Sequence, residues 1–185
     1  MRDGLLVIDV ISDFAHPDGD TLLASFRERN DAMQAVLRDA RSRGIPVLYA
    51  NDNRGVWDGD APGMIRRAID AGPGGALVAS VAPQAGEPFI VKPRYSAFDS
   101  TPLELLLAEA NVERLVLIGA SLEMCVAQTA IDAREHGWKV TVVPDACPAV
   151  DAEMAEVALA YLARVAGVRI HSAASMPPAA APTAA

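Results

Sequence analysis

Six short, almost uninterrupted apolar runs constrain what this chain can fold into. They span residues 5–10, 45–50, 89–91, 115–118, 140–143 and 168–170. Strands that are buried on both faces have this composition, because neither face meets water. Helical periodicity fills most of the stretches between them, over 26–43, 101–110, 124–136 and 151–165. This alternation predicts an α/β fold with a doubly wound, mostly parallel six-stranded sheet flanked by helices, of the Rossmann-like type.

Turn-forming residues indicate where the helical stretches begin and end. The segment Thr101-Pro102-Leu103-Glu104 matches a capping box with proline at the first helical position, which predicts a helix start. Gly44 and Gly137 follow two helical stretches and predict their ends. Residues 51–88 differ, because they are long, rich in Gly and Pro and only partly helical in pattern. A long segment after the C-terminal end of a strand often forms part of a binding site or a lid.

Length and charge limit the domain count and the kinds of partner. The chain has 185 residues, which is enough for one domain with a sizeable core. We expect a single domain over 1–171 and a low-complexity tail over 172–185 that is mobile unless it docks on a neighbouring subunit. Acidic residues outnumber basic residues by 24 to 16, for a net charge of −8. This charge argues against nucleic acid or an anionic membrane as a partner.

Targeting signals and cysteines suggest a location. No run approaches the ~18 apolar residues of a membrane span, and the run at 5–10 is too short for a signal sequence. The two cysteines, Cys125 and Cys147, are too few for a disulfide framework, although the sequence leaves their pairing open. We therefore expect a protein of the reducing cytoplasm.

Three reactive side chains follow three of the predicted strands. Asp9 lies near the end of the first run, Lys92 directly follows the third, and Cys125 follows the fourth through a short turn. The carboxyl ends of parallel strands meet at one edge of a sheet, where ligands bind. Cys125 is also expected at a helix N-terminus, where backbone N–H groups and the helix dipole favour a thiolate. The three residues would form a nucleophile, a base and a cation in one crevice.

Each of these residues also has a purely structural interpretation. Asp9 could cap a loop, although a charge inside an apolar run needs a partner. Lys92 stands beside a proline and could be a solvated loop residue. A single cysteine is more often a small buried apolar residue than a nucleophile. The three together favour a reactive site more strongly than any one of them.

Four segments resemble the isochorismatase-like cysteine hydrolases, from about residue 5 to residue 143 or beyond. Residues 6–10 with Asp13 and Phe14 are similar to the opening strand of that family and its aspartate. The other three are the lysine segment Val91-Lys92-Pro93-Arg94-Tyr95-Ser96-Ala97-Phe98, the nucleophile turn and helix over 119–137, and Val142-Val143-Pro144-Asp145-Ala146 after the fifth strand. The resemblance implies the isochorismatase-like hydrolase fold.

The resemblance also implies a mechanism that needs no cofactor. Asp9, Lys92 and Cys125 would form a catalytic triad in which Asp9 takes the thiol proton and Lys92 holds the thiolate or the developing oxyanion. Attack on a carbonyl carbon would give a thioester, which water then hydrolyses. In similar proteins the oxyanion donors are two backbone N–H groups in a turn with a cis peptide. Here they would be those of Ser121 and Cys125, with the cis bond between Ala120 and Ser121.

The chain departs from the family at three positions. Metal-binding members have Asp-x-His after the second strand, whereas this chain has Asn51-Asp52-Asn53-Arg54 and no His between His16 and His136. We therefore expect no metal. Ile11 stands where the family often has Gln, and Leu122 where it often has Thr, which suggests a more apolar substrate pocket or a weakened site.

The chain has few aromatic residues, and those that flank the motifs are candidate walls of a substrate pocket. We expect Phe14, Trp57 and Tyr95 to contact the substrate together with Ile11 and Leu122, and give Phe98 less weight. The alternative is that the aromatic residues belong to the core or to a subunit interface.

Several functions remain open from the sequence. The leading one is hydrolysis of a small amide or ureido compound without a metal. The alternatives are an isochorismatase-type vinyl-ether hydrolase, a catalytically weak member that serves as a binding or scaffold subunit, and a redox-sensing cysteine. Similar proteins often assemble, so we expect a homodimer or homotetramer that binds a small-molecule substrate. The helix that begins near Asp151 is a candidate interface.

Overall fold

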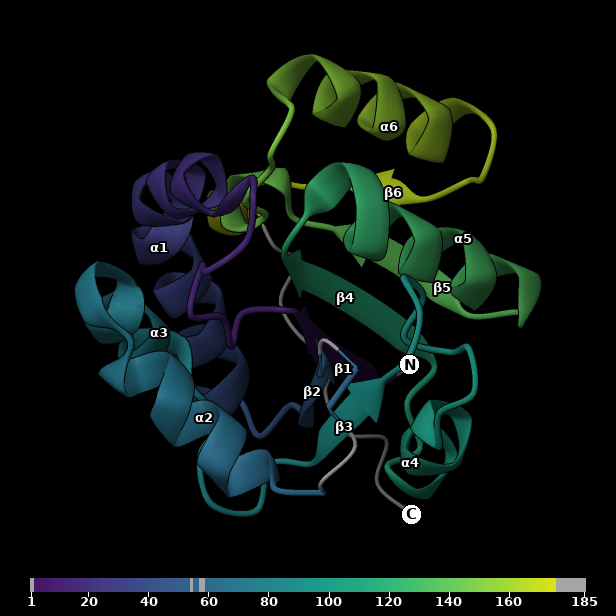
Figure 1. Ribbon diagram of the computed structural model, residues 1–185. Coiled ribbons are helices and arrows are strands. Elements are labelled where there is room, and N and C mark those ends of the chain that lie inside the picture. Colours follow the sequence, from purple (N-terminus) through teal and green to yellow (C-terminus); the bar gives the residue numbers. More distant parts are fainter. Residues whose placement is uncertain (1, 54, 57–58, 176–185) are drawn as a thin grey trace.

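A computed structural model describes residues 2–53, 55–56 and 59–175 (Figure 1). It contains one six-stranded sheet in the order β3-β2-β1-β4-β5-β6, and every neighbouring pair is parallel. The strands are β1 (Asp3–Ile8), β2 (Val47–Asp52), β3 (Phe89–Lys92), β4 (Arg114–Gly119), β5 (Lys139–Val142) and β6 (Arg169–Ile170). All six apolar runs therefore overlap a strand, and the predicted doubly wound α/β sheet is confirmed, with every strand parallel.

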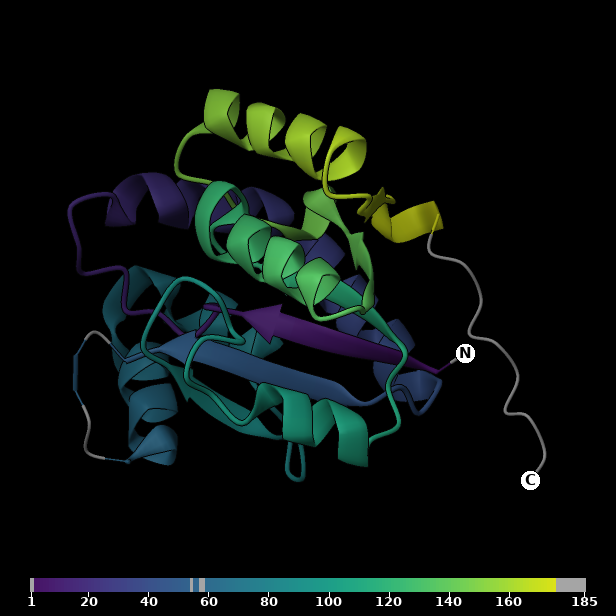
Figure 2. The same ribbon diagram turned by 90° about the vertical axis from the view of Figure 1, so that its right-hand side faces the viewer.

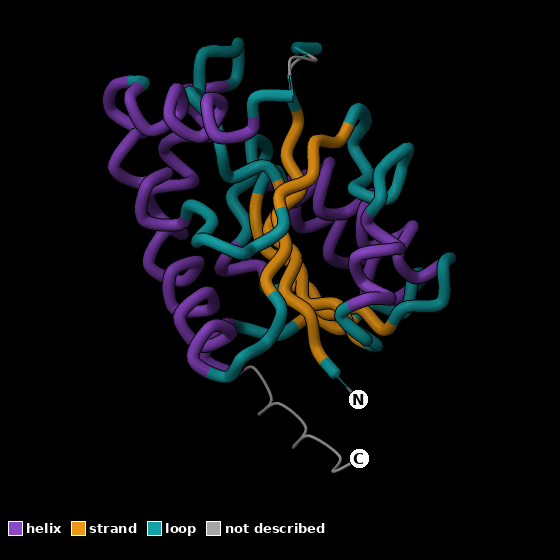
Figure 3. Tube along the Cα trace, turned by 90° about the horizontal axis from the view of Figure 1, so that it is seen from below, coloured by secondary structure: helices purple, strands orange, loops and turns teal. Residues whose placement is uncertain are grey.

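The helices are α1 (Gly19–Ser42), α2 (Ala61–Asp70), α3 (Gly75–Val81), α4 (Leu103–Glu109), α5 (Ala127–Glu135) and α6 (Ala152–Arg164). Short helical turns, η1 to η4, cover Gly72–Gly74, Leu122–Val126, Pro144–Ala146 and Ala173–Ser175. Helices α1, α2 and α3 lie on one side of the sheet, and α4 and α5 lie on the other (Figures 1 and 3). Helix α6 lies alongside α5 at the outside of the molecule (Figure 2).

The core has two layers because successive side chains of each strand point to opposite faces. Leu5 and Val7 pack beneath α1 and α3, whereas Leu6 and Ile8 pack beneath α4 and α5. All four are at most 1% exposed. Burial of β1 on both faces explains why its sequence does not alternate between apolar and polar residues.

Some predicted boundaries were wrong. Helix α1 begins at Gly19 rather than near residue 26, because Leu22 and Leu23 extend its buried stripe toward the N-terminus. The capping box does not close, since Thr101 Oγ1 accepts from the Leu103 N–H but the Glu104 carboxylate pairs with His136 instead. By contrast, the segment 51–88 is partly helical as expected, and contains α2, η1 and α3.

The predicted C-terminal tail is partly described. Its first residues continue into η4, and both carboxylate oxygens of Asp145 accept from the Ala173 N–H, at 3.0 and 2.9 Å. Residues 176–185 lie outside the described part of the chain. Within the described part, none of the helices combines the length and the apolarity that crossing a bilayer requires.

Candidate active site

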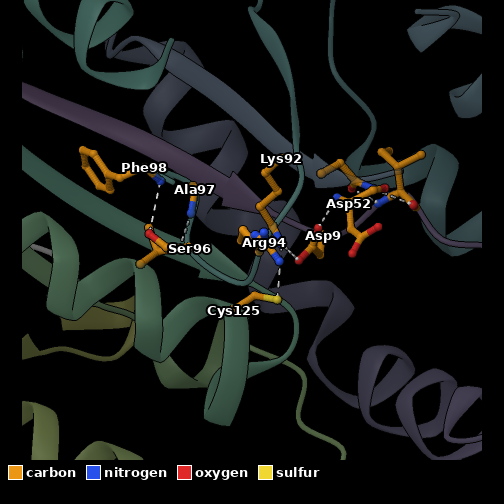
Figure 4. A network of polar contacts seen from close by, with 11 residues as sticks. Asp9, Asp52, Lys92, Arg94, Ser96, Ala97, Phe98 and Cys125 are labelled. Carbon is orange, nitrogen blue, oxygen red and sulfur yellow. Dashed lines mark hydrogen bonds and ion pairs between the residues drawn. The ribbon is translucent and has the colours of Figure 1, made fainter. Parts of the chain in front are cut away.

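The three reactive side chains meet at the carboxyl edge of the sheet (Figure 4). Asp9 directly follows β1, Lys92 is the last residue of β3, and Cys125 lies in the π-helical turn η2 between β4 and α5. Strands β1 and β4 are neighbours, and β2 separates β1 from β3. The long lysine side chain spans this gap, which is why three strands that are far apart in sequence can contribute to one cluster.

The Lys92 ammonium is the centre of the cluster. Its Nζ lies 2.7 Å from Asp9 Oδ2 and 3.3 Å from Cys125 Sγ. It also donates to the Arg94 carbonyl oxygen at 2.9 Å. The lysine side chain has no solvent exposure, whereas that of Asp9 is 16% exposed. An ammonium group has three protons to donate, and these three acceptors can use all of them.

Two hydrogen bonds to the backbone of β2 fix the position of Asp9. Asp9 adopts a left-handed backbone conformation with φ 49°, and its N–H donates to the Ala50 carbonyl at 2.9 Å. Its Oδ1 accepts from the Asp52 N–H at 2.6 Å, which leaves Oδ2 to face Lys92. Both contacts come from β2, so that strand sets the position of the carboxylate between its neighbours.

Burial and mutual charge determine the protonation of the cluster. Burial raises the pKa of Asp9, and the charge of Lys92 only partly opposes this. Burial also raises the pKa of Cys125, to about 12, and the Asp9 carboxylate adds to the shift. For Lys92 burial acts the other way, but attraction to Asp9 and Cys125 outweighs it and raises the pKa. These shifts favour the thiol form of Cys125, whereas its place near a helix N-terminus favours the thiolate.

The turn that carries Cys125 begins with a close approach between two strands. Gly119 has φ 114°, and a Cβ there would lie 2.0 Å from the Ile8 carbonyl oxygen, so only glycine fits. The following peptide bond, Ala120–Ser121, is cis. The Ser121 carbonyl then accepts from the N–H groups of Met124 and Val126, and neither bond uses the N–H of Cys125.

Two contacts attach this turn to the loop before α6. The Leu122 N–H donates to the Pro148 carbonyl at 2.9 Å. Glu123 Oε1 accepts from the N–H groups of Val150 and Asp151, at 2.8 and 3.0 Å. The turn that carries Cys125 is thus held from both sides, by β1 through Gly119 and by the start of α6.

The segment that follows Lys92 is held against α5. Thr129 Oγ1 accepts from the Ala97 N–H at 3.0 Å, and Ser96 Oγ accepts from the Phe98 N–H at 3.1 Å (Figure 4). Thr129 is completely buried. These bonds fix the loop whose Arg94 carbonyl binds the Lys92 ammonium.

The predicted pocket residues are placed in several different surroundings. Ile11 and Leu122 are 5% and 2% exposed and belong to the two cores on opposite faces of the sheet. Phe14 is also buried and packs edge-on against Phe26, with ring centroids 5.5 Å apart. Tyr95 is 63% exposed. Trp57 lies outside the described residues, and a role for any of them in substrate binding stays a prediction.

Phe98 and His136 form a separate contact. Their rings stack with centroids 5.2 Å apart, and His136 also pairs with Glu104. Because His136 directly follows α5 and Glu104 lies in α4, these contacts link α5 to α4.

Asn51 belongs to the site but was not predicted from the sequence. Its Oδ1 accepts from the Ile11 N–H and its Nδ2 donates to the Ile11 carbonyl, both at 3.0 Å. The amide thus joins β2 to the loop that follows Asp9. Asn51 is only 4% exposed. The sequence feature that could have identified Asn51 is a polar residue directly after an apolar run, because a buried amide needs hydrogen-bond partners.

The described part of the chain holds no group of three or more His, Cys, Asp or Glu side chains placed to bind a metal ion. Arg54, on which the metal-free prediction depends, lies outside the described residues. The expectation that the chain binds no metal therefore stays a prediction. Cys125 and Cys147 are both free thiols, so the pairing that the sequence left open does not occur.

Comparison with known proteins identifies relatives along almost the whole chain. The model of the isochorismatase domain matches residues 3–174. Maleamate amidohydrolase of Pseudomonas putida is 31% identical over 150 residues, which are 77% of this chain and 70% of that protein. The uncharacterised isochorismatase family protein YaaI of Bacillus subtilis is 29% identical over 161 residues, 87% of this chain and 88% of that protein.

Solved structures give the same result. N-carbamoylsarcosine amidase from Thermoplasma acidophilum aligns with a TM-score of 0.72 and 27% identity, over 95% of this chain and 99% of that one. A pyrazinamidase/nicotinamidase from Streptococcus mutans aligns with a TM-score of 0.72 and 27% identity, over 92% of this chain and all of that one. The extent of the family match and the shared fold show that this chain is a hydrolase that belongs to the isochorismatase family.

Proposed function

We propose that this protein hydrolyses a small amide, ureido or related C–N compound through a thioester on Cys125. The observation that carries the proposal is the position of Lys92 Nζ, within 2.7 Å of Asp9 Oδ2 and 3.3 Å of Cys125 Sγ. A base, a cation and a thiol in mutual contact are the groups that nucleophilic attack on a carbonyl needs. Asp9, Lys92 and Cys125 are the proposed catalytic triad.

In the first half of the reaction Asp9 takes the Cys125 proton as the sulfur attacks the carbonyl carbon. A C–S bond forms, and the carbonyl electron pair moves to the oxygen. The raised pKa of Asp9 makes its carboxylate a stronger base than an ordinary aspartate. When the tetrahedral intermediate collapses, the C–N bond breaks, and the amine leaves with the proton that Asp9 holds.

In the second half water hydrolyses the thioester. Asp9 takes a proton from the attacking water, a C–O bond forms, and the C–S bond breaks. The product acid leaves, and the sulfur regains a proton, which restores the thiol. The cycle is balanced without a metal or another cofactor.

Lys92 and the turn around Ser121 stabilise charge in this scheme. The ammonium keeps Asp9 ionised before attack and balances the negative charge that moves between sulfur and oxygen. The N–H groups of Ser121 and Cys125 are the proposed oxyanion donors. The hydrogen bonds to the Ser121 carbonyl support this role, because they hold the turn without using the Cys125 N–H.

The names of the relatives suggest the chemical class of the substrate. Besides maleamate amidohydrolase, they include an N-carbamoylsarcosine amidase and a ureidoacrylate amidohydrolase, and each name describes a small substrate with a hydrolysable C–N bond. We propose a substrate of this class for the present chain. The expected substrate contacts, the homo-oligomer and the cytoplasmic location stay predictions beside it.

A panel experiment tests the proposal. The purified protein and its Cys125→Ala variant are incubated with maleamate, N-carbamoylsarcosine, ureidoacrylate and nicotinamide, and ammonia release is measured. We expect release from at least one compound by the wild type and none by the variant. Equal release by both proteins would reject the nucleophile. Isochorismate is tested beside the panel with pyruvate release as the readout, because hydrolysis of its vinyl ether breaks a C–O bond and gives no ammonia. Activity on isochorismate alone would favour the vinyl-ether alternative, and silence on every compound would favour the scaffold alternative.

A further inference from the structure

Asn53 carries a buried amide group that is paired at one end only. The residue directly follows β2 and is 7% exposed. Its Oδ1 accepts from the Gly55 N–H at 2.9 Å, and this bond fixes the orientation of the amide. Within the part of the chain that the structure describes, Nδ2 is buried and has no hydrogen-bond partner. Its two N–H donors are therefore kept from water without an acceptor, which is unfavourable unless a ligand supplies one.

Buried asparagines elsewhere in this fold use both ends of the amide. The described residues include two others, Asn30 and Asn51. Asn51 Oδ1 and Nδ2 both bond to the Ile11 backbone, at 3.0 Å. Asn30 Oδ1 and Nδ2 both contact the Ser80 hydroxyl, at 3.3 and 3.1 Å. The unpaired nitrogen of Asn53 is thus an exception, and the packing of the fold does not explain it.

The position of Asn53 places this donor beside the candidate active site. The N–H of the preceding residue, Asp52, donates to Asp9 Oδ1 at 2.6 Å. Strands β2 and β4 are the two neighbours of β1, so Asn53 and Ser121 follow strands on opposite sides of Asp9. Neighbouring strands are ~4.8 Å apart, which puts the ends of β2 and β4 about 10 Å from each other. A small molecule whose carbonyl lies at the Ser121 turn can therefore reach Asn53 with a second polar group.

We propose that Asn53 is a specificity-determining residue whose Nδ2 donates to an oxygen of the substrate remote from the C–N bond that is broken. The inference rests on the proposed function and narrows the substrate class. An amide nitrogen donates and does not accept, so its partner is a carboxylate or carbonyl oxygen rather than an ammonium or a hydrocarbon group. This end of the pocket is then polar, whereas Ile11 and Leu122 suggested a more apolar one. Because Nδ2 is covered in the free protein, the substrate displaces the groups that cover it on binding.

The first test separates binding from catalysis. Asn53→Ser keeps a side-chain oxygen that can accept from the Gly55 N–H, removes the amide nitrogen and adds no charge. Wild type and variant are assayed with maleamate, N-carbamoylsarcosine and ureidoacrylate, which carry a carboxylate away from the C–N bond, and with nicotinamide, which carries none. For the best carboxylate substrate we expect KM to rise about tenfold with kcat unchanged, because the bond is the same in the bound substrate and in the transition state. An unchanged KM, a fall in kcat alone, or a wild type that hydrolyses only nicotinamide overturns the inference.

The second test measures binding without turnover. The unfolding temperature of Cys125→Ala is measured with and without the same four compounds, since a ligand that binds the folded state raises it. We expect at least one carboxylate compound to raise it. The rise should be lost in Cys125→Ala/Asn53→Ser and kept in the control Cys125→Ala/Asn111→Ser. Asn111 is exposed and precedes β4, at the end of that strand away from Cys125.

The two tests distinguish failure of the inference from failure of the proposed function. A rise that survives Asn53→Ser, or no rise with any carboxylate compound, overturns the inference whether or not the wild type hydrolyses these compounds. A rise that depends on Asn53, together with no hydrolysis by the wild type, supports Asn53 as a binding residue and rejects the proposed hydrolysis.

Discussion

The Lys92 ammonium lies 2.7 Å from the Asp9 carboxylate, and the lysine side chain is entirely shielded from water. A buried cation is stable only with a paired anion, so the two residues depend on each other. The same cation lies 3.3 Å from Cys125 Sγ. One ion pair therefore has two consequences, because it holds β1 to β3 across β2 and it sets the charge that the thiol experiences.

Removal of Lys92 alone should cost stability as well as activity. Lys92→Met leaves the Asp9 carboxylate without its cation, and we expect the free energy of unfolding to fall by about 3–5 kcal/mol. Asp9→Asn/Lys92→Met removes both charges and should recover a large part of that loss. Urea unfolding followed by circular dichroism measures both values. Hydrolysis should be lost in both variants.

A different result would change the role of the pair. If Lys92→Met unfolds at the wild-type urea concentration, the Asp9 carboxylate has another partner or becomes protonated at little cost. Arg43→Met is a suitable control, since Arg43 forms an ion pair with Asp39 at the surface. Its loss should cost less than about 1 kcal/mol.

Alkylation should reveal the protonation state of Cys125. Because the pKa of this thiol is raised to about 12, its reaction rate with iodoacetamide should still be increasing well above pH 9. The experiment uses Cys147→Ala, so that Cys125 is the one thiol labelled. A rate that reaches its plateau below pH 8 would instead indicate a resting thiolate paired with Lys92.

The rate of hydrolysis should depend on the Asp9 carboxylate at the acid end. As the proposed base, Asp9 can take a proton only when it is ionised, and its pKa is raised by burial. Activity should therefore be lost as the pH falls through a value above 3.8, the ordinary value for aspartate. A profile of kcat/KM against pH measures this limb. An acid limb at or below 3.8 would contradict the assignment of Asp9 as the base.

Asn51 should affect catalysis through the position of Asp9. Asn51→Ala removes both side-chain bonds to the Ile11 backbone and leaves two buried polar groups without partners, at a cost of about 2 kcal/mol. We expect kcat to fall at least about tenfold with a smaller change in KM. Asn30→Ala is the matched control, since Asn30 is buried and bonded to Ser80 on the α1–α3 side. It should lower stability and leave kcat unchanged.

Much of the fold could be predicted because burial on two faces leaves a strong trace in the sequence. The six apolar runs overlap the six strands, and the helical stretches between them follow from periodicity. The start of α1 was missed because Gly19 is a weak helix former, and packing of Leu22 and Leu23 outweighs that preference. The helices within the segment 51–88 were harder to predict, because Gly and Pro obscure their periodic pattern.

The meeting of Asp9, Lys92 and Cys125 could be predicted because parallel strands bring their ends to one edge. What the sequence could not supply was the balance of forces on Cys125. Its place near a helix N-terminus favours a thiolate, but burial and the Asp9 carboxylate raise its pKa. The role of Asn51 was equally hidden, since it depends on β2 lying between β1 and β3. Such relationships exist only once the strand order is known.

A side chain at Gly119 should destabilise the protein through a steric clash, and Gly137 provides a control position without that clash. Gly119 and Gly137 both have positive φ, at 114° and 91°. A Cβ at Gly119 would lie 2.0 Å from the Ile8 carbonyl oxygen, whereas one at Gly137 would have nothing within 4 Å. Gly137→Ala should therefore lower the free energy of unfolding by about 1 kcal/mol, the cost of the backbone conformation alone.

Gly119→Ala should cost at least about 3 kcal/mol, because β4 must also move away from β1. That movement would carry the turn with Ser121 and Cys125 away from Asp9, so hydrolysis should fall even at temperatures where the variant is folded. Thermal unfolding and ammonia release measured on both variants separate the two effects. If Gly119→Ala is as stable and as active as Gly137→Ala, the close approach of β1 and β4 does not position the nucleophile turn.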